Sequence, residues 1–165
     1  MEQRTLILDN TRIDKKLQRM AYQIWERNSN ETSVLLVGIQ GGGLAVANNI
    51  AARLRKISPL NVEVASLKMN KRQPLAENMH LDADLTGRSV VLVDDVANSG
   101  KTLLYALKPL LNYELKKIMI AILVDRKHKT FPVSPDIVGH SIATTLQEHI
   151  LVETNNNEIE AAYLS

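Results

Sequence analysis

Two adjacent carboxylates and a loop of small residues stand next to each other in the segment VVLVDDVANSGKTL, residues 90–103. Asp94 and Asp95 follow an apolar run, and neighbouring carboxylates can accept hydrogen bonds from the two hydroxyls of a diol. The loop leads into a helix-favouring sequence, where backbone N–H groups and the hydroxyls of Ser99 and Thr102 can hold one phosphate. This order predicts a site for a ribose that carries a 5′-phosphate. The simpler interpretation is a strand that ends in two solvated acids before a capped helix.

Gly100, Lys101 and Thr102 also raise the question of a nucleoside-triphosphate site. The phosphate-binding loop of nucleoside triphosphatases has the pattern Gly-x4-Gly-Lys-Ser/Thr, which would place its first glycine at position 95. Asp95 stands there instead. Because a carboxylate at this point would repel a triphosphate, the spacing argues against this class of site.

Composition narrows the class of protein. The chain has 165 residues, a formal net charge of +2 and no cysteine, so disulfides and thiolate metal sites are excluded. This length accommodates one domain with a full core, and we expect a single domain over residues 1–165. The charged start lacks the apolar region of a signal peptide, and no apolar run approaches the ~20 residues that span a bilayer. We therefore expect a cytoplasmic protein without a membrane partner.

Hydrophobic periodicity predicts alternating strands and helices. Apolar runs typical of strands covered on both faces occupy residues 33–39 and 89–95, and further strands are expected at residues 61–67 and 116–125. Segments that favour helices occupy residues 12–28, 44–57 and 100–111. A short strand is expected at residues 4–9, with Asn10 and Thr11 as the cap of the first helix. This alternation predicts an α/β fold with a mostly parallel sheet, helices on both faces and a site at the carboxyl ends of the strands.

The remaining segments have no sustained period. Residues 68–88 are expected to form a long polar loop, and residues 126–153 are broken into short pieces by Pro132 and Pro135. Residues 154–165 are interpreted as a polar tail.

Residues 90–103 closely resemble the phosphoribosyl-diphosphate (PRPP) motif of the type I phosphoribosyltransferases. The resemblance implies a three-layer, Rossmann-like fold with a small hood. It also implies that Asp94 and Asp95 bind the ribose hydroxyls and that the following loop holds the 5′-phosphate. Magnesium would bind mainly to diphosphate and ribose oxygens, as Mg²⁺ prefers. The substrate-binding residues implied here are Asp94, Asp95, Val96, Ala97, Asn98, Ser99, Gly100, Lys101 and Thr102.

Three further segments resemble one branch of this family, the pyrimidine-operon attenuation regulators that are also uracil phosphoribosyltransferases. They are RIDKKLQRMAYQIWERN, VLLVGIQGGGLAVANNIAARL and AILVDRKHKTFPVSPDIVGHSIAT, and they occur in the order expected for the branch. The resemblance implies transfer of a phosphoribosyl group from PRPP to a nucleobase, uracil first, with release of diphosphate. It also implies a homo-oligomer, and an RNA loop as a partner in the regulators.

The diphosphate site departs from the branch. The resemblance places it at Gln40, Gly41, Gly42 and Gly43, a loop without the basic residues expected there. A glycine-rich turn can still offer backbone N–H groups. Cations in the following lid segment could supply the missing charge and exclude water. Lys68 is the catalytic candidate there, with Lys71 and Arg72 beside it, and a solvated basic loop is the alternative.

Base recognition is expected after the last core strand. The resemblance places backbone groups of Ile142, Ala143 and Thr144 against the base edge, with His140 nearby and Arg126 as a catalytic candidate. An ion pair of Asp125 with Arg126 is the structural alternative. Family members that act on 6-oxopurines usually have Asp where this chain has Asn98. Because Asn cannot accept the proton as a base would, this residue favours a pyrimidine.

Two other functions stay open. A basic surface could bind RNA, and its residues would be Arg12, Lys15, Lys16, Arg19, Arg27, Arg126, Lys127, His128 and Lys129. Against it, Asp14 and Glu26 also lie on the first helix, and Tyr22 stands where the branch is expected to have histidine. The neutral loop at 40–43 also fits a PRPP-binding protein that has lost catalysis.

Overall fold

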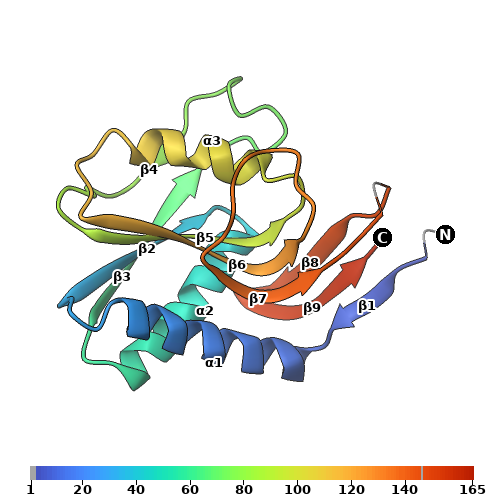
Figure 1. The fold of residues 1–165 in the computed structure, drawn as a ribbon, viewed down its shortest axis with the longest axis horizontal. Helices are drawn as coiled ribbons and strands as arrows, with labels where there is room; N and C mark the ends of the chain where they lie inside the picture. Colours follow the sequence, from blue (N-terminus) through green and yellow to red (C-terminus); the bar gives the residue numbers. More distant parts are fainter. Residues whose placement is uncertain (1–2, 146) are drawn as a thin grey trace.

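A six-stranded sheet forms the centre of the molecule (Figure 1). The computed structural model describes residues 3–145 and 147–165. The strand order is β4-β3-β2-β5-β6-β7, and all neighbours are parallel except the pair of β3 and β4. The strands are β2 (Ser33–Ile39), β3 (Asn61–Lys68), β4 (His80–Leu81), β5 (Ser89–Ala97), β6 (Lys117–Arg126) and β7 (Ile137–Ile142).

Helices cover both faces of this sheet, which makes three layers. The helices α1 (Asn10–Arg27) and α2 (Gly42–Ile57) lie on one face, and α3 (Lys101–Leu110) lies on the other. Successive strand residues alternate between the two cores, because side chains of a strand point to opposite faces. In β5, Val91 and Val93 pack with α1 and α2, whereas Val90 and Leu92 pack with α3. The continuous apolar runs therefore reflect burial on both sides, and the predicted α/β fold is confirmed.

A second sheet is built from the two ends of the chain, in the order β1-β9-β8. Its strands are β1 (Thr5–Leu8), β8 (Ile150–Asn155) and β9 (Glu158–Leu164). The predicted polar tail is therefore wrong: residues 158–164 form the central strand of this sheet. A tight turn joins β8 to β9 at Asn156 and Asn157, which have φ of 48° and 68°, values that Asn tolerates better than most residues. This sheet is the hood.

Two local details differ from expectation. The first helix is capped by Asp9, whose carboxylate accepts from the backbone N–H of Arg12 at 2.8 Å, so the predicted caps Asn10 and Thr11 lie inside the helix. Strand β5 also continues past Asp94 and Asp95 to Ala97, which places both acids within the strand. No helix among the described residues is long and apolar enough to cross a membrane.

Candidate active site

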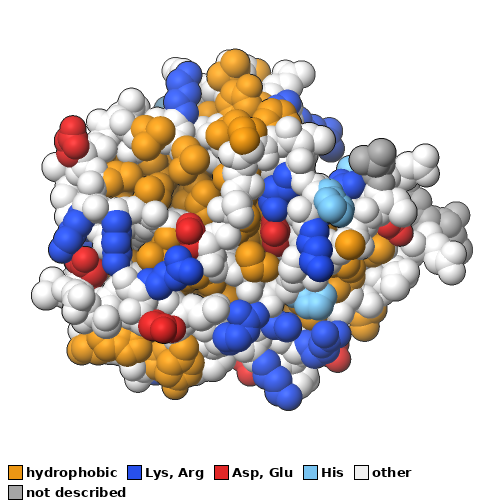
Figure 2. Space-filling model, in the orientation of Figure 1, with side chains coloured by type: hydrophobic (Ala, Val, Ile, Leu, Met, Phe, Trp, Pro, Cys, Tyr) orange, Lys and Arg blue, Asp and Glu red, His pale blue; other side chains and the backbone are white. Residues whose placement is uncertain are grey.

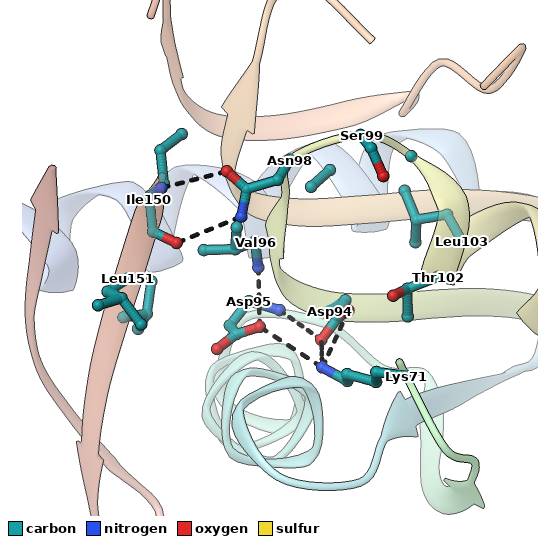
Figure 3. A pocket seen from close by; sticks show the side chains of 13 residues that line it. Lys71, Asp94, Asp95, Val96, Asn98, Ser99, Thr102, Leu103, Ile150 and Leu151 are labelled. Carbon is teal, nitrogen blue, oxygen red and sulfur yellow. Dashed lines mark hydrogen bonds and ion pairs between the residues drawn. The ribbon is translucent and has the colours of Figure 1, made fainter. Parts of the chain in front are cut away.

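A cavity of about 250 Å³ lies where β5 ends, between the central sheet and the hood (Figure 3). One wall carries the two acids and the small-residue loop, and the other carries the start of β8. The lining residues are Lys71, Asp94, Asp95, Val96, Ala97, Asn98, Ser99, Gly100, Thr102, Leu103, Ile150, Leu151 and Val152. The structure thus brings the predicted ribose and phosphate residues together, with the exception of Lys101, whose side chain is not part of the lining.

The two acids are held by their own backbone and by the start of α2. The Asp94 carboxylate, 1% exposed, accepts from the N–H of Asp95 at 2.9 Å, and Asp95 accepts from the N–H of Val96 at 2.8 Å. A Cβ on Gly42 would lie 1.9 Å from Asp95 Oδ2, and one on Gly43 would lie 2.7 Å from Asp94 Oδ1. Glycine is therefore required at both positions for the acids to lie against the first turn of α2.

The lid segment contributes a cation to the acids. Lys71 Nζ lies 3.1 Å from Asp94 Oδ1, 3.3 Å from Asp94 Oδ2 and 4.0 Å from Asp95 Oδ1. The pKa of Asp94 is raised to about 8, first by burial and then by the neighbouring Asp95 charge, while the charge of Lys71 acts in the opposite direction. Burial and like charge both disfavour the ionised form of Asp94.

The small-residue loop ends in a helix N-terminus that points into the cavity. Gly100 precedes α3 with φ of +86°, and no side chain caps the helix there. Ser99 Oγ accepts from the N–H of Lys101 at 3.2 Å, and the Thr102 hydroxyl lies on the same side (Figure 3). Uncapped N–H groups, the positive end of the helix dipole and two hydroxyls form an anion-binding arrangement.

The connection from β6 to β7 supports this loop from behind. The N–H groups of Thr130 and Phe131 both donate to the carbonyl of Ser99, at 3.2 Å and 3.1 Å. Lys129 is fixed by an ion pair with Asp125 at 2.7 Å and by donation to the carbonyl of Arg126 at 3.0 Å. The basic run after β6 is therefore partly structural.

Arg126 does not line the cavity. It is buried, and its Nη2 donates to the carbonyl of Thr145 at 2.7 Å. The alternative pair of Asp125 with Arg126 is not what forms, because Asp125 meets Lys129. Arg126 thus holds the segment that was expected to read the base.

The lid cations separate in space. Lys68, at the end of β3, lies in a neighbouring cavity with Gln40, whereas Lys71 reaches the acids. Arg72 is exposed, and its backbone N–H donates to Asn70 at 3.1 Å. The expected loop at residues 68–88 also contains β4 and a fully buried Leu85, so part of it is anchored.

The expected base-reading residues Ile142, Ala143 and Thr144 lie outside the lining. Thr144 Oγ1 is buried without a hydrogen-bond partner in the described part of the chain. His140 lies on β7, where burial and then the charges of Lys16 and Arg12 lower its pKa. It therefore lies near α1 and is not among the residues that line the cavity.

Sequence reasoning missed Ile150, Leu151 and Val152 as site residues. They form the apolar wall opposite the acids. The signal was the short ILV run in a segment otherwise interrupted by polar residues.

Comparison with known proteins finds relatives over most of the chain. The phosphoribosyl transferase domain model matches residues 3–154. The chain is 32% identical to the bifunctional protein PyrR of Halalkalibacterium halodurans, covering 90% of this chain and 89% of that protein. It is 31% identical to the bifunctional protein PyrR of Clostridium novyi, covering 98% and 97%.

Solved structures share the fold. The hypoxanthine phosphoribosyltransferase of Trypanosoma cruzi aligns with a TM-score of 0.77 at 15% identity, covering 95% of each chain. A hypoxanthine-guanine phosphoribosyltransferase of Bacillus anthracis aligns with a TM-score of 0.76 at 18% identity, covering 96% of each chain. With this fold and a model match over most of its length, the chain belongs to the phosphoribosyl transferase domain family, with the type I fold.

Proposed function

We propose that the protein transfers the 5-phosphoribosyl group of PRPP to a nucleobase, uracil first, and releases diphosphate. The observation that carries the proposal is one cavity lined by both Asp94 and Asp95 and by the loop at the start of α3. The spacing of these groups along β5 suits a ribose diol at one end and a 5′-phosphate at the other.

The chemistry needs positioning and charge stabilisation. A ring nitrogen of the base attacks C1′, the bond from C1′ to diphosphate oxygen breaks, and its electron pair leaves with diphosphate, while the base nitrogen loses its proton to solvent water. Asp94 and Asp95 orient the ribose, and residues 97–102 hold the 5′-phosphate. Fixing both ends of the sugar supplies much of the rate by orientation.

Diphosphate would be held at the loop before α2. The helix begins at Gly42, so the backbone N–H groups of Gly42 and Gly43 lie in its first turn, and Lys68 shares a cavity with Gln40. The N–H of Gln40 itself donates to the carbonyl of Leu67 at 2.8 Å. Lys71 must leave Asp94 before a diol can bind there, and its released charge is then available to diphosphate. We therefore assign charge stabilisation to Lys71 and Lys68 together.

Magnesium fits the donor set as a substrate-bound ion. Within residues 3–145 and 147–165, no three His, Cys, Asp or Glu side chains come together as a metal cage. Mg²⁺ commonly binds through one or two carboxylates plus substrate oxygens, and the acid pair provides such carboxylates. When bound, the ion would neutralise charge on the leaving diphosphate.

The choice of uracil rests on two features. The resemblance to the attenuation-regulator branch implies it, and Asn98 replaces the acid usual in enzymes for 6-oxopurines. Residues Ile142, Ala143 and Thr144 are proposed to read the base, with Arg126 as the residue that positions them through Thr145. The unpartnered hydroxyl of Thr144 supports this assignment, because a buried polar group without a partner is rare.

A base panel tests the proposal. Purified protein is incubated with PRPP, Mg²⁺ and uracil, cytosine, hypoxanthine, guanine or adenine, and nucleotide formation is followed by chromatography. Formation of uridine monophosphate, lost in Asp95→Asn, is expected. If no base gives a nucleotide, the proposal of enzymatic activity is overturned. Calorimetric titration with PRPP would then show whether the protein binds PRPP without catalysis.

RNA-dependent regulation is the second candidate, favoured by one observation. The pKa of Lys16 is lowered, first by burial and then by the charges of Arg19 and Arg12, which lie near it. His140 lies near the same basic residues, because the charges of Lys16 and Arg12 also lower its pKa. Figure 2 shows Lys and Arg side chains gathered at the lower right of the molecule, where Figure 1 places the first half of α1. Arg19, however, donates to the carbonyls of Val138 and Gly139 and is partly used by the fold.

A gel-shift against the leader RNA of the organism's own pyrimidine genes tests this role. Binding at least tenfold tighter than to a scrambled RNA, weakened by Lys16→Ala, would support it. Equal binding of both RNAs would remove it. A homo-oligomer is also proposed, with the exposed Tyr22 of α1 as a contact, and light scattering of the native protein measures it.

A further inference from the structure

The side chain of Asn98 joins the loop of residues 97–102, here called the phosphate-type loop, to the hood. Its amide oxygen accepts from the N–H of Ile150 at 3.1 Å, and its Nδ2 donates to the carbonyl of the same residue at 3.3 Å (Figure 3). Two residues that lie opposite each other on paired antiparallel strands exchange two hydrogen bonds in the same way. A single side chain thus takes the place of a peptide group beside the start of β8.

These two bonds connect parts of the molecule that no strand ladder connects. Asn98 follows β5 of the central sheet, and Ile150 begins β8 of the second sheet. Ile150 and the next two residues are the apolar wall of the cavity. The position of this wall therefore depends on a residue of the phosphate-type loop.

The amide is chemically suited to this link. Ile150 presents a donor and an acceptor, and an amide can satisfy both, whereas a carboxylate can only accept. The same bonds use the oxygen of Asn98 and one of its two N–H groups. The side chain is therefore engaged with β8 and is not free to accept a proton from a base.

We propose that Asn98 is a positioning residue that transmits occupation of the ribose-phosphate site to the wall that faces the nucleobase. A phosphate bound by the backbone N–H groups of residues 97–102 holds the loop in one conformation. Asn98 then holds Ile150, and the base meets a wall that is already in place. Binding of the sugar phosphate and of the base is thereby coupled, and the coupling is reciprocal. This inference rests on the proposed function.

Calorimetry with two non-reacting ligands tests the coupling. Ribose 5-phosphate lacks the diphosphate leaving group, so uracil can be titrated with and without it. In the native protein, saturating ribose 5-phosphate is expected to tighten uracil binding by about tenfold, within the usual range of such couplings. In Asn98→Ala the ratio should fall close to one, whereas ribose 5-phosphate should still bind, because the backbone N–H groups of the loop remain. Asn98→Asp should also lower the ratio, because the carboxylate faces the carbonyl of Ile150.

Asn49→Ala is the matched control. Asn49 Nδ2 also donates to the second sheet region, to the carbonyl of Asn157 at 2.7 Å, but outside the cavity. It should retain the native ratio. An unchanged ratio in folded Asn98→Ala, or an equal fall in Asn49→Ala, would overturn the proposal.

A second measurement uses the native protein alone. Amide hydrogen exchange at Ile150 should slow at least threefold on saturation with ribose 5-phosphate, because its N–H donates to Asn98. No change would overturn the link even if a variant fails to fold or another base is the substrate. Ribose 5-phosphate that binds without uracil binding contradicts the choice of base. Absence of ribose 5-phosphate binding contradicts the proposed function itself, and the link with it.

Discussion

Lys71 Nζ lies 3.1 Å from Asp94 Oδ1, so a cation of the lid occupies the acid that the ribose is proposed to use. The lysine is only partly covered, with a side chain 38% exposed, whereas Asp94 is buried. The carboxylate is thus held inside the fold, and the more exposed partner of the pair is the long side chain from the lid. Under the proposed function, ribose binding exchanges Lys71 for a sugar hydroxyl as the partner of Asp94.

This exchange predicts that Lys71→Met strengthens the binding of ribose 5-phosphate but slows turnover with PRPP. Ribose 5-phosphate should bind several-fold more tightly, because no internal cation competes for Asp94. Turnover with PRPP should fall by about tenfold or more, because a charge on the departing diphosphate is lost. Calorimetry and steady-state kinetics measure the two effects. Lys116→Met, which removes an ion pair with Glu31 away from the cavity, should change neither, and weaker ribose 5-phosphate binding in Lys71→Met would contradict the exchange.

The raised pKa of Asp94 predicts how stability depends on pH. Because the pKa of Asp94 in the folded state, about 8, exceeds the ordinary aspartate pKa of 3.8, the folded state holds an extra proton between these values. In that window the Asp94 carboxyl group is ionised in the unfolded state and protonated in the folded state. The native protein therefore becomes progressively less stable as pH rises. The melting temperature of Asp94→Asn, measured relative to that of the native protein, should rise from pH 5 to pH 8. The expected rise is about 2–4 °C for each kcal/mol of stability that the native protein loses.

Asp84 provides a control of opposite sign. Hydrogen bonds from Thr86 lower its pKa, so its stabilising contribution is present above the unfolded pKa and is lost as pH falls. The difference in melting temperature between Asp84→Asn and the native protein should therefore disappear at acid pH. A pH-independent difference between Asp94→Asn and the native protein would show that Asp94 does not titrate in this window.

Gly42 predicts a substitution that damages the ribose site through a neighbour. In Gly42→Ala the new methyl group would overlap the Asp95 carboxylate, which must move away. Ribose 5-phosphate affinity should fall by at least tenfold. Gly41→Ala is the comparison, because its Cβ would meet open space while its φ of +95° costs backbone strain. That variant should lose stability but keep its ribose 5-phosphate affinity, as calorimetry and thermal melting would detect.

Arg126 predicts a kinetic signature of positioning. Arg126→Ala removes the bond to the Thr145 carbonyl, so the segment next to the proposed base site loses its support. The KM for uracil should rise at least fivefold, with the KM for PRPP nearly unchanged. Lys127→Ala, an exposed neighbour on the same connection, should leave both unchanged. A rise confined to the KM for PRPP would instead place Arg126 at the diphosphate.

Much of the central sheet could be predicted because its signal is local. Strands such as β2 and β5 are buried on both faces, and continuous apolar runs identify such strands without knowledge of their neighbours. The motif at residues 90–103 likewise contains its acids, loop and helix start in one segment. The structure gathers most of these residues around one cavity.

The hood was harder to predict because its signal depends on partners far away in sequence. In β9, Ile159 and Ala161 are buried while Glu158 and Glu160 are exposed, an alternation typical of a strand with one covered face. The run of asparagines before it gave the whole segment a polar character. Which lid lysine reaches the acids was equally hidden, because the path of residues 69–79 is set by tertiary contacts.

The order of the second sheet ties completion of the cavity to the course of synthesis. Strand β9 lies between β1 and β8, so the wall formed by Ile150 and its neighbours lacks its inner support until residues 158–164 have been made. The acids and the phosphate-type loop emerge from the ribosome much earlier. A nascent chain could therefore form the three-layer core and hold a sugar phosphate before it can enclose a base. Contacts between such distant segments form slowly, which makes closure of the hood the expected late step of folding.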